Sequence, residues 1–201
     1  MKKSFKGIYS TRILFISMVC FLFQGCSTSN RIYTRNDIVH SAKRFELKYS
    51  VRDRDRRSPL IYFTQSIVKE VNPPNEISYT AYDVLTLSAS SFRPDEKAIL
   101  IIDNEANTMA INKMELDNIR KISENTTNIL TSDSTNLSVV IGYSDNNTKV
   151  ARFSYRIPVE TISKIRDSDQ FSLHYYSGPS MITVKPKKKS IKKIKQLIDS
   201  I

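Results

Sequence analysis

The chain is poor in the residues from which metal sites and disulfide scaffolds are built. Its 201 residues include two cysteines, two histidines, four glycines and no tryptophan. This composition excludes the disulfide-scaffold, collagen-like and coiled-coil classes. The two histidines, His40 and His174, are isolated and have no cysteine at the spacing of a zinc site. An apolar fraction of 40% is still enough to bury a core, so we expect a folded chain.

Motifs for nucleotide binding or hydrolysis are also missing from the sequence. Only Gly142 and Gly178 follow residue 25, so a glycine-rich phosphate loop cannot form. The chain has no G-x-S-x-G motif. The acids at 167–169 fit a turn better than the dense oxygen cluster that Ca²⁺ requires. A hydrolase whose carboxylates converge only in the folded chain stays an alternative. We expect a non-enzymatic protein without cofactor or metal.

The first 25 residues have the pattern of an export signal. Four cations, Lys2, Lys3, Lys6 and Arg12, precede an apolar run at 13–23 and are accompanied by no acid. A helix that crosses a bilayer needs about 20 apolar residues, so this run is too short for a permanent anchor. A basic start, a short apolar run and a polar continuation are typical of a secretory signal. A buried core helix is the alternative, which the four cations disfavour.

The signal ends in the segment Leu-Phe-Gln-Gly-Cys-Ser at 22–27. This segment resembles the lipobox of bacterial lipoproteins, in which a peptidase cuts before a cysteine that is then acylated. The resemblance implies that Gly25 is the last signal residue and that Cys26 becomes the lipidated N-terminus. The family favours Leu and a small residue at the two places where this chain has Phe23 and Gln24. A secreted protein with an unused cysteine is the alternative.

Cysteine usage agrees with this resemblance. The other cysteine, Cys20, lies in the signal, so the cleaved chain keeps one thiol at its first position. Two or more acyl chains hold a protein stably on a membrane. Ser27 resembles the second residue of lipoproteins that are sent to the outer membrane. We therefore expect a lipid anchor in the outer membrane of a Gram-negative envelope, on the periplasmic side, with an envelope protein as partner.

The positive charge has a different meaning in an exported protein. The full chain has a net charge of +11, and removal of the four signal cations leaves +7. Such a charge is typical of nucleic-acid binding, but export removes that partner. Anionic headgroups and acidic polysaccharides are the counter-charges available in the envelope. The segment 185–195 holds seven lysines and no acid, which fits either a solvated helix face or an anion-binding surface. These lysines are Lys185, Lys187, Lys188, Lys189, Lys192, Lys193 and Lys195.

The pattern of the chain predicts a signal at 1–25, a lipidated tether at 26–36 and a single domain at 37–201. A short capped helix is expected to open the domain at 36–45. Alternating or continuous apolar residues then predict strands, and turn residues separate them. The fold class is α+β, an antiparallel sheet meander with short helices on one face. The expected strands cover 45–51, 59–63, 79–89, 98–102, 108–111, 171–175 and 181–184.

Two segments, 114–122 and 157–165, resemble each other at an offset of 43 residues. In both, apolar residues are spaced by three, with an acid near the start and a lysine near the end, as in a short helix. One interpretation is a β-β-α repeat over 76–122 and 126–165, and chance similarity is the other. The last helix is expected to place Ile191, Ile194 and Leu197 on the sheet and its lysines in solvent.

Overall fold

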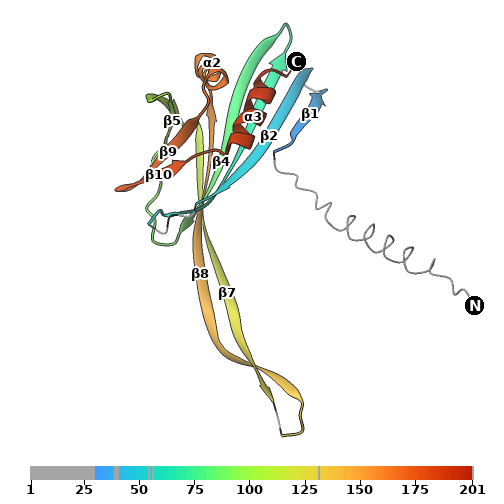
Figure 1. Ribbon diagram of the computed structural model, residues 1–201, viewed down its shortest axis with the longest axis vertical. Coiled ribbons are helices and arrows are strands. Elements are labelled where there is room, and N and C mark those ends of the chain that lie inside the picture. The colour runs from blue at the N-terminus through green and yellow to red at the C-terminus, as the bar shows by residue number, and fades with distance from the viewer. Residues whose placement is uncertain (1–29, 39–40, 54, 56, 131, 201) are drawn as a thin grey trace, which may run out of the picture.

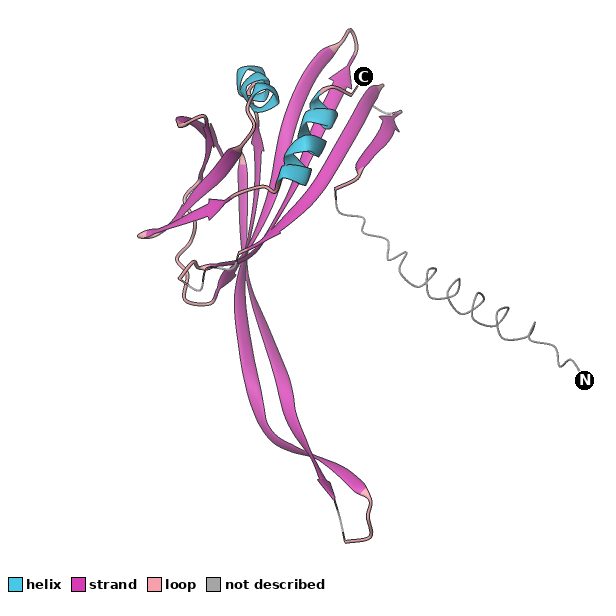
Figure 2. Ribbon diagram, in the orientation of Figure 1, coloured by secondary structure: helices cyan, strands magenta, loops and turns pink. Residues whose placement is uncertain are grey.

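The part of the chain that the structure describes is mostly antiparallel β-sheet, with two short helices (Figures 1 and 2). The computed structural model describes residues 30–38, 41–53, 55, 57–130 and 132–200. The α+β class is therefore correct in its broad form. The strands are β1 (Ile32–Asp37), β2 (Ala42–Arg52), β3 (Leu60–Asn72), β4 (Glu76–Ser88), β5 (Lys97–Ile102), β6 (Glu105–Ala110), β7 (Lys113–Leu130), β8 (Asn136–Arg156), β9 (Phe171–Ser177) and β10 (Ser180–Val184), and the helices are α2 (Val159–Asp167) and α3 (Lys188–Ile198).

The larger sheet has six strands in the order β1-β2-β3-β4-β8-β7. Every second residue of a strand points to the same face of its sheet, and the residues that point inward here are mostly apolar. In β2 these residues are Phe45, Leu47 and Tyr49, each of which is buried. This alternation is the pattern that predicted the strand from the sequence.

The smaller sheet has four strands in the order β10-β9-β5-β6. Its buried residues, among them Leu100, Leu173 and Ile182, join those of the larger sheet in one hydrophobic cluster. The two sheets therefore share a core, as expected for a layered domain.

Helix α3 closes part of this core by packing against β2 and β3 (Figure 1). Ile191, Ile194 and Leu197 are buried, which confirms the predicted amphipathic helix at the C-terminus. The buried Lys69 of β3 holds the end of the helix. Its Nζ donates to the carbonyl oxygens of Ile198 at 2.7 Å and Ser200 at 2.6 Å, groups that a helix terminus leaves without internal partners.

The helix predicted at 114–122 is wrong, because this segment is part of strand β7. Its counterpart at 157–165 does form a helix, α2, so the two segments differ in structure and the β-β-α repeat does not exist. The spacing of Ile119 and Ile122 imitated a helical stripe. Both side chains are instead exposed on a strand that has no covering layer.

Two predictions near the start of the domain also need correction. Residues 42–45, expected to end a helix, begin β2. Residues 32–36, expected in the tether, belong to β1 and pair with β2. His40 lies outside the described residues, so its predicted place in a helix is not addressed.

Candidate contact surfaces

A long β-hairpin projects from the body of the protein (Figure 1). β8 pairs with β4 only from Thr148 to Arg156, whereas it pairs with β7 along almost its whole length. Beyond this point the two strands continue alone, from 120 to 130 in β7 and from 136 to 147 in β8. At about 3.3 Å per residue, each strand extends roughly 40 Å from the sheet. We call residues 120–147 the arm.

The part of the arm next to the body is polar and is held by cross-strand ion pairs. Arg120 of β7 lies 2.9 Å from the Asp145 carboxylate of β8. Where the arm joins the sheet, Arg152 pairs with Asp117. The Ser144 hydroxyl is 3.4 Å from both the carbonyl oxygen of Ser123 and the side-chain oxygen of Asn125. Such exposed contacts contribute little individually, but together they favour the register of the two strands.

The distal part of the arm is almost uncharged and carries exposed apolar side chains. Residues 125–144 contain one charged residue, Asp133, whereas a quarter of the whole chain is charged. The exposed fractions of Leu130, Ile141 and Tyr143 are 67%, 67% and 69%. Large apolar groups gathered on an exposed element of a soluble protein typically mark a contact surface.

The register of the hairpin gives the distal arm two different faces. Opposite residues of paired strands share a face, so Ile129 and Leu137 lie together and Thr127 lies with Val139. The other face pairs Asn128 with Ser138. A register shift at Asn125/Thr126 separates this region from the polar part, and Ile141 is the extra residue. The first face is the more apolar of the two. The second face also carries Leu130, opposite Asn136, and Val140, opposite Thr126, so exposed apolar side chains lie on both faces of the distal arm.

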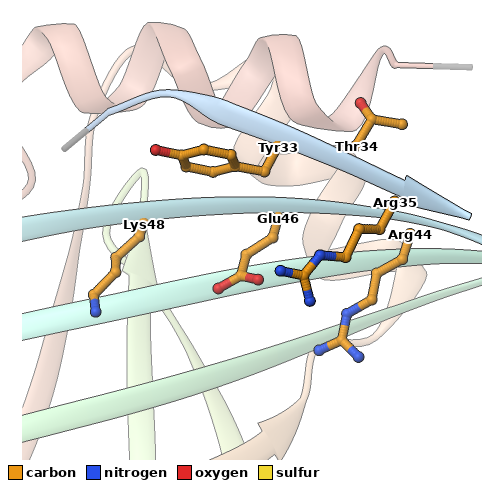
Figure 3. Close-up of a pocket in the computed structure, with 6 residues that line it drawn as sticks. All are labelled: Tyr33, Thr34, Arg35, Arg44, Glu46 and Lys48. Atoms are coloured by element: carbon orange, nitrogen blue, oxygen red, sulfur yellow. The ribbon is translucent and has the colours of Figure 1, made fainter. Parts of the chain in front are cut away.

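A second surface lies on the outer face of the large sheet, over β1 and β2 (Figure 3). It is a shallow hollow of about 470 Å³ lined by Tyr33, Thr34, Arg35, Arg44, Glu46 and Lys48. Three of the lining residues are cations, and the carboxylate of Glu46 lies between Lys48 and Arg35 in Figure 3. Arg44 is also 3.6 Å from Glu70. This surface is open and basic.

The lysines singled out from the sequence lie along α3 and the segment that precedes it. Lys185, Lys187, Lys188, Lys189 and Lys192 are exposed, and Lys193 and Lys195 are half-buried. Lys195 is 3.9 Å from Asp169, a long ion pair at the surface. Because the apolar side of α3 is buried, the exposed lysines form one basic strip beside the sheet.

A buried polar network lies in the core between the two sheets. Asp83 of β4 is 1% exposed. Gln65 donates to the Asp83 carboxylate at 2.7 Å, and the Tyr175 hydroxyl of β9 donates to its second oxygen at 2.5 Å. The hydroxyl of Tyr49 donates to the side-chain oxygen of Gln65 at 2.7 Å, and Gln65 also donates to Tyr155 at 3.1 Å. The network therefore joins five strands.

Burial changes the acidity of this network. It raises the pKa of Asp83 from its ordinary value of 3.8 to about 6, although the hydrogen bonds from Tyr175, Tyr155 and Gln65 act in the opposite direction. The pKa values of Tyr49, Tyr155 and Tyr175 are raised mainly by burial. The three tyrosines are therefore neutral, and as hydroxyl donors Tyr175 binds the Asp83 carboxylate and Tyr49 binds Gln65.

The remaining sequence candidates occupy ordinary positions. His174 lies in β9, where its Nε2 is 2.8 Å from the Ser172 hydroxyl. The pKa of His174 is lowered, first by burial and second by the nearby positive charge of Lys185. Among the described residues, no group of histidines, cysteines and acids could hold a metal ion. Within the same ranges, no helix has the length and hydropathy needed to cross a bilayer. Gly25 and Cys26 lie outside the described residues.

Sequence reasoning missed the arm and the buried carboxyl group of Asp83, although the sequence contains a pattern that indicates each of them. Asp83 alternates in phase with Ala81 and Leu85, which places it on the inner face of its strand. The arm is rich in Thr, Val and Ile, residues that favour strands over helices.

A scan against protein-family models, a search of the curated proteins and a search of the solved structures each found no match.

Proposed function

We propose that the chain is a lipid-anchored, non-enzymatic scaffold or binding protein of the cell envelope, and that the arm is its contact element. The observation that carries the proposal is the arm itself. An isolated two-stranded hairpin is at best marginally stable in water, and the exposed apolar residues at its end add to this cost. Such an element is expected to be stabilised by a partner.

The anchor rests on the sequence. The short apolar run at 13–23 and the lipobox-like segment before Cys26 support export and acylation. Acyl chains on Cys26 would hold the folded body close to the membrane surface, with the outer membrane, periplasmic side, as the location we favour. Mass spectrometry of the native N-terminal peptide tests this part. A peptide that begins at an acylated Cys26 supports it, and an uncut or unacylated N-terminus overturns it.

The role of the arm is tested by shortening it. Replacing residues 120–147 with Asn-Gly would join Ile119 to Thr148, which are paired in the register, through a two-residue turn. The body should still unfold in one cooperative thermal transition, because the removed residues lie beyond the part of β8 that pairs with β4.

The readout is formaldehyde crosslinking of the full-length protein in whole cells. We expect the wild type to form adducts through the arm and the shortened variant to lose them while remaining acylated. Equal adducts from both proteins would overturn the role of the arm. The anchor and the arm are therefore tested separately.

A second candidate function is favoured by the basic strip on α3. Five exposed lysines within 185–192 form a surface that can bind anionic glycans or lipid headgroups. The strip belongs to the body, so this function does not depend on the arm. Its test is a salt-dependent binding experiment, argued below.

A further inference from the structure

The arm has two free strand edges. β7 is the last strand of the six-stranded sheet, so its outer edge has no neighbouring strand among the described residues. β8 is covered by β4 only from Thr148 onward, which leaves its outer edge free from 136 to 147. Each edge presents backbone N–H and C=O groups that a further strand could bind.

The other sheet edges are short and flanked by charge or proline. β1 and β6 have six residues each, and β10 has five. β1 contains Arg35, and β10 is followed by Lys185 and Pro186. Short edges, basic residues and proline are the devices by which proteins prevent unwanted strand pairing.

The distal arm lacks these devices. β7 has 18 residues, and the segment 125–144 contains no lysine, arginine or proline. Identical arms can therefore approach one another with little electrostatic repulsion. Among the strands that the structure describes, only a second arm offers a free edge of matching length.

We infer that the arms of separate copies of this chain pair edge to edge, the free edge of β7 in one copy binding the free edge of β8 in the next. The strand directions fit. β7 and β8 are antiparallel, so two arms that lie side by side and point the same way bring β7 next to an antiparallel β8. This inference rests on the proposed function, because acyl anchors would hold all copies on one surface in the same orientation.

The shape of the molecule limits the size of such an assembly. The body is much wider than the arm (Figure 1), so paired arms require the bodies to spread around them. Each copy uses two different edges, which makes the contact heterologous, and a rotation between copies closes such a contact into a ring. Pairing would also align Ile129 and Leu137 of neighbouring arms along one face.

Crosslinking between two proteins that each carry one added cysteine tests the pairing. Asn128→Cys places a thiol on β7 and Ser138→Cys places one on β8, and the two positions lie on the same face of the arm. The full-length proteins, one of them tagged, are co-expressed in the same cells and treated with a short bismaleimide. The reagent should span about 8 Å, which tolerates a register shift of two residues.

We expect mixed dimers of the Asn128→Cys and Ser138→Cys proteins to exceed dimers of either protein with itself. In the proposed pairing, residues 128 and 138 of neighbouring arms lie one strand spacing apart, about 5 Å, whereas equal positions lie two spacings apart, about 10 Å. The matched control is Thr34→Cys, in the exposed edge strand β1, which should give no dimer with Ser138→Cys. The wild type reports any crosslink through Cys20 or Cys26. Circular dichroism of each variant confirms that the exposed substitutions leave the fold intact.

Three results would overturn the inference. Self-dimers of Asn128→Cys in excess of mixed dimers would indicate a twofold pairing of β7 with β7. Adducts of Asn128→Cys with a different protein, without mixed dimers, would leave the scaffold function standing and assign the arm a foreign partner. Complete alkylation of both thiols without any adduct would leave the arm unpaired, which contradicts the inference and the arm's proposed role but not the lipid anchor.

Discussion

The hydroxyl of Tyr175 donates a 2.5 Å hydrogen bond to the carboxylate of Asp83, across 92 residues of chain. Tyr175 belongs to β9 of the small sheet and Asp83 to β4 of the large sheet, so this bond joins the two layers inside the core. A buried carboxylate is costly unless its oxygens are hydrogen-bonded, and here both of them are. The network should therefore control how the stability of the body depends on pH.

Replacing Asp83 with Asn should remove a pH-dependent part of the stability. Burial raises the pKa of Asp83 from 3.8 to about 6, so the folded chain binds more protons than the unfolded chain between these values. The stabilising contribution is complete below about pH 4 and is lost as the pH rises through 6. A shift of this size corresponds to about 3 kcal/mol. The free energy of unfolding of the wild type should therefore fall by about this amount between pH 4 and pH 7. In Asp83→Asn this fall should be absent.

Urea unfolding of the wild type and the variant at several pH values gives the comparison. The matched control is Asp103→Asn, which removes an exposed carboxylate in the turn between β5 and β6 and should leave the wild-type slope unchanged. Identical pH profiles for Asp83→Asn and the wild type would refute the assignment.

The body was largely predictable from the sequence and the arm was not, for one physical reason. In β2 and β9, one face is buried and the other faces solvent, so apolar and polar residues must alternate along the sequence with a period of two. The arm, with Ile119 at its base, has no covering layer, so nothing imposes that period on 119–147. Its apolar residues were therefore free to fall at a spacing that imitates a helix.

The candidate sites follow the same rule. The basic strip was predictable because the burial of Ile191 and Ile194 fixes which side of α3 faces water. The network around Asp83 was not, because its five members come from five strands that only the folded chain brings together. Cys26 stays a prediction from local sequence alone.

The two glycines outside the signal should differ sharply in their tolerance of alanine. Gly178 has a φ of +58°, and a Cβ there would lie 2.6 Å from Cδ2 of Phe92. We expect Gly178→Ala to lower the free energy of unfolding by about 1–3 kcal/mol, through backbone strain and the clash. Gly142 on the arm has open space around it, so Gly142→Ala should change stability by less than about 0.5 kcal/mol. Thermal unfolding of both proteins measures this difference, and equal effects would contradict it.

Replacing Lys69 with Met should loosen the end of α3. Methionine keeps an apolar stem of similar length but cannot donate to the carbonyl oxygens of Ile198 and Ser200. We expect a loss of about 1–2 kcal/mol in the free energy of unfolding, because one buried and one partly buried carbonyl group lose a charged donor. Hydrogen exchange should accelerate first in the last turn of α3. Lys48→Met, on the outer face of the sheet, is the control and should leave exchange in α3 unchanged.

The basic strip should bind polyanions more strongly than the net charge of the chain explains. Binding of the full-length protein in detergent to immobilised dextran sulfate provides the test, with the salt concentration at elution as the readout. One variant removes four charges from the strip by replacing Lys188, Lys189, Lys192 and Lys193 with Gln. The matched variant removes four charges from the rest of the body by replacing Lys43, Lys48, Lys97 and Lys113 with Gln. Charges that contact a polyanion together release more bound ions than scattered charges, so the first variant should elute at clearly lower salt than the second. Elution of both variants at the same salt would mean that only the net charge matters, and the strip would then be no more than the solvated face of a helix.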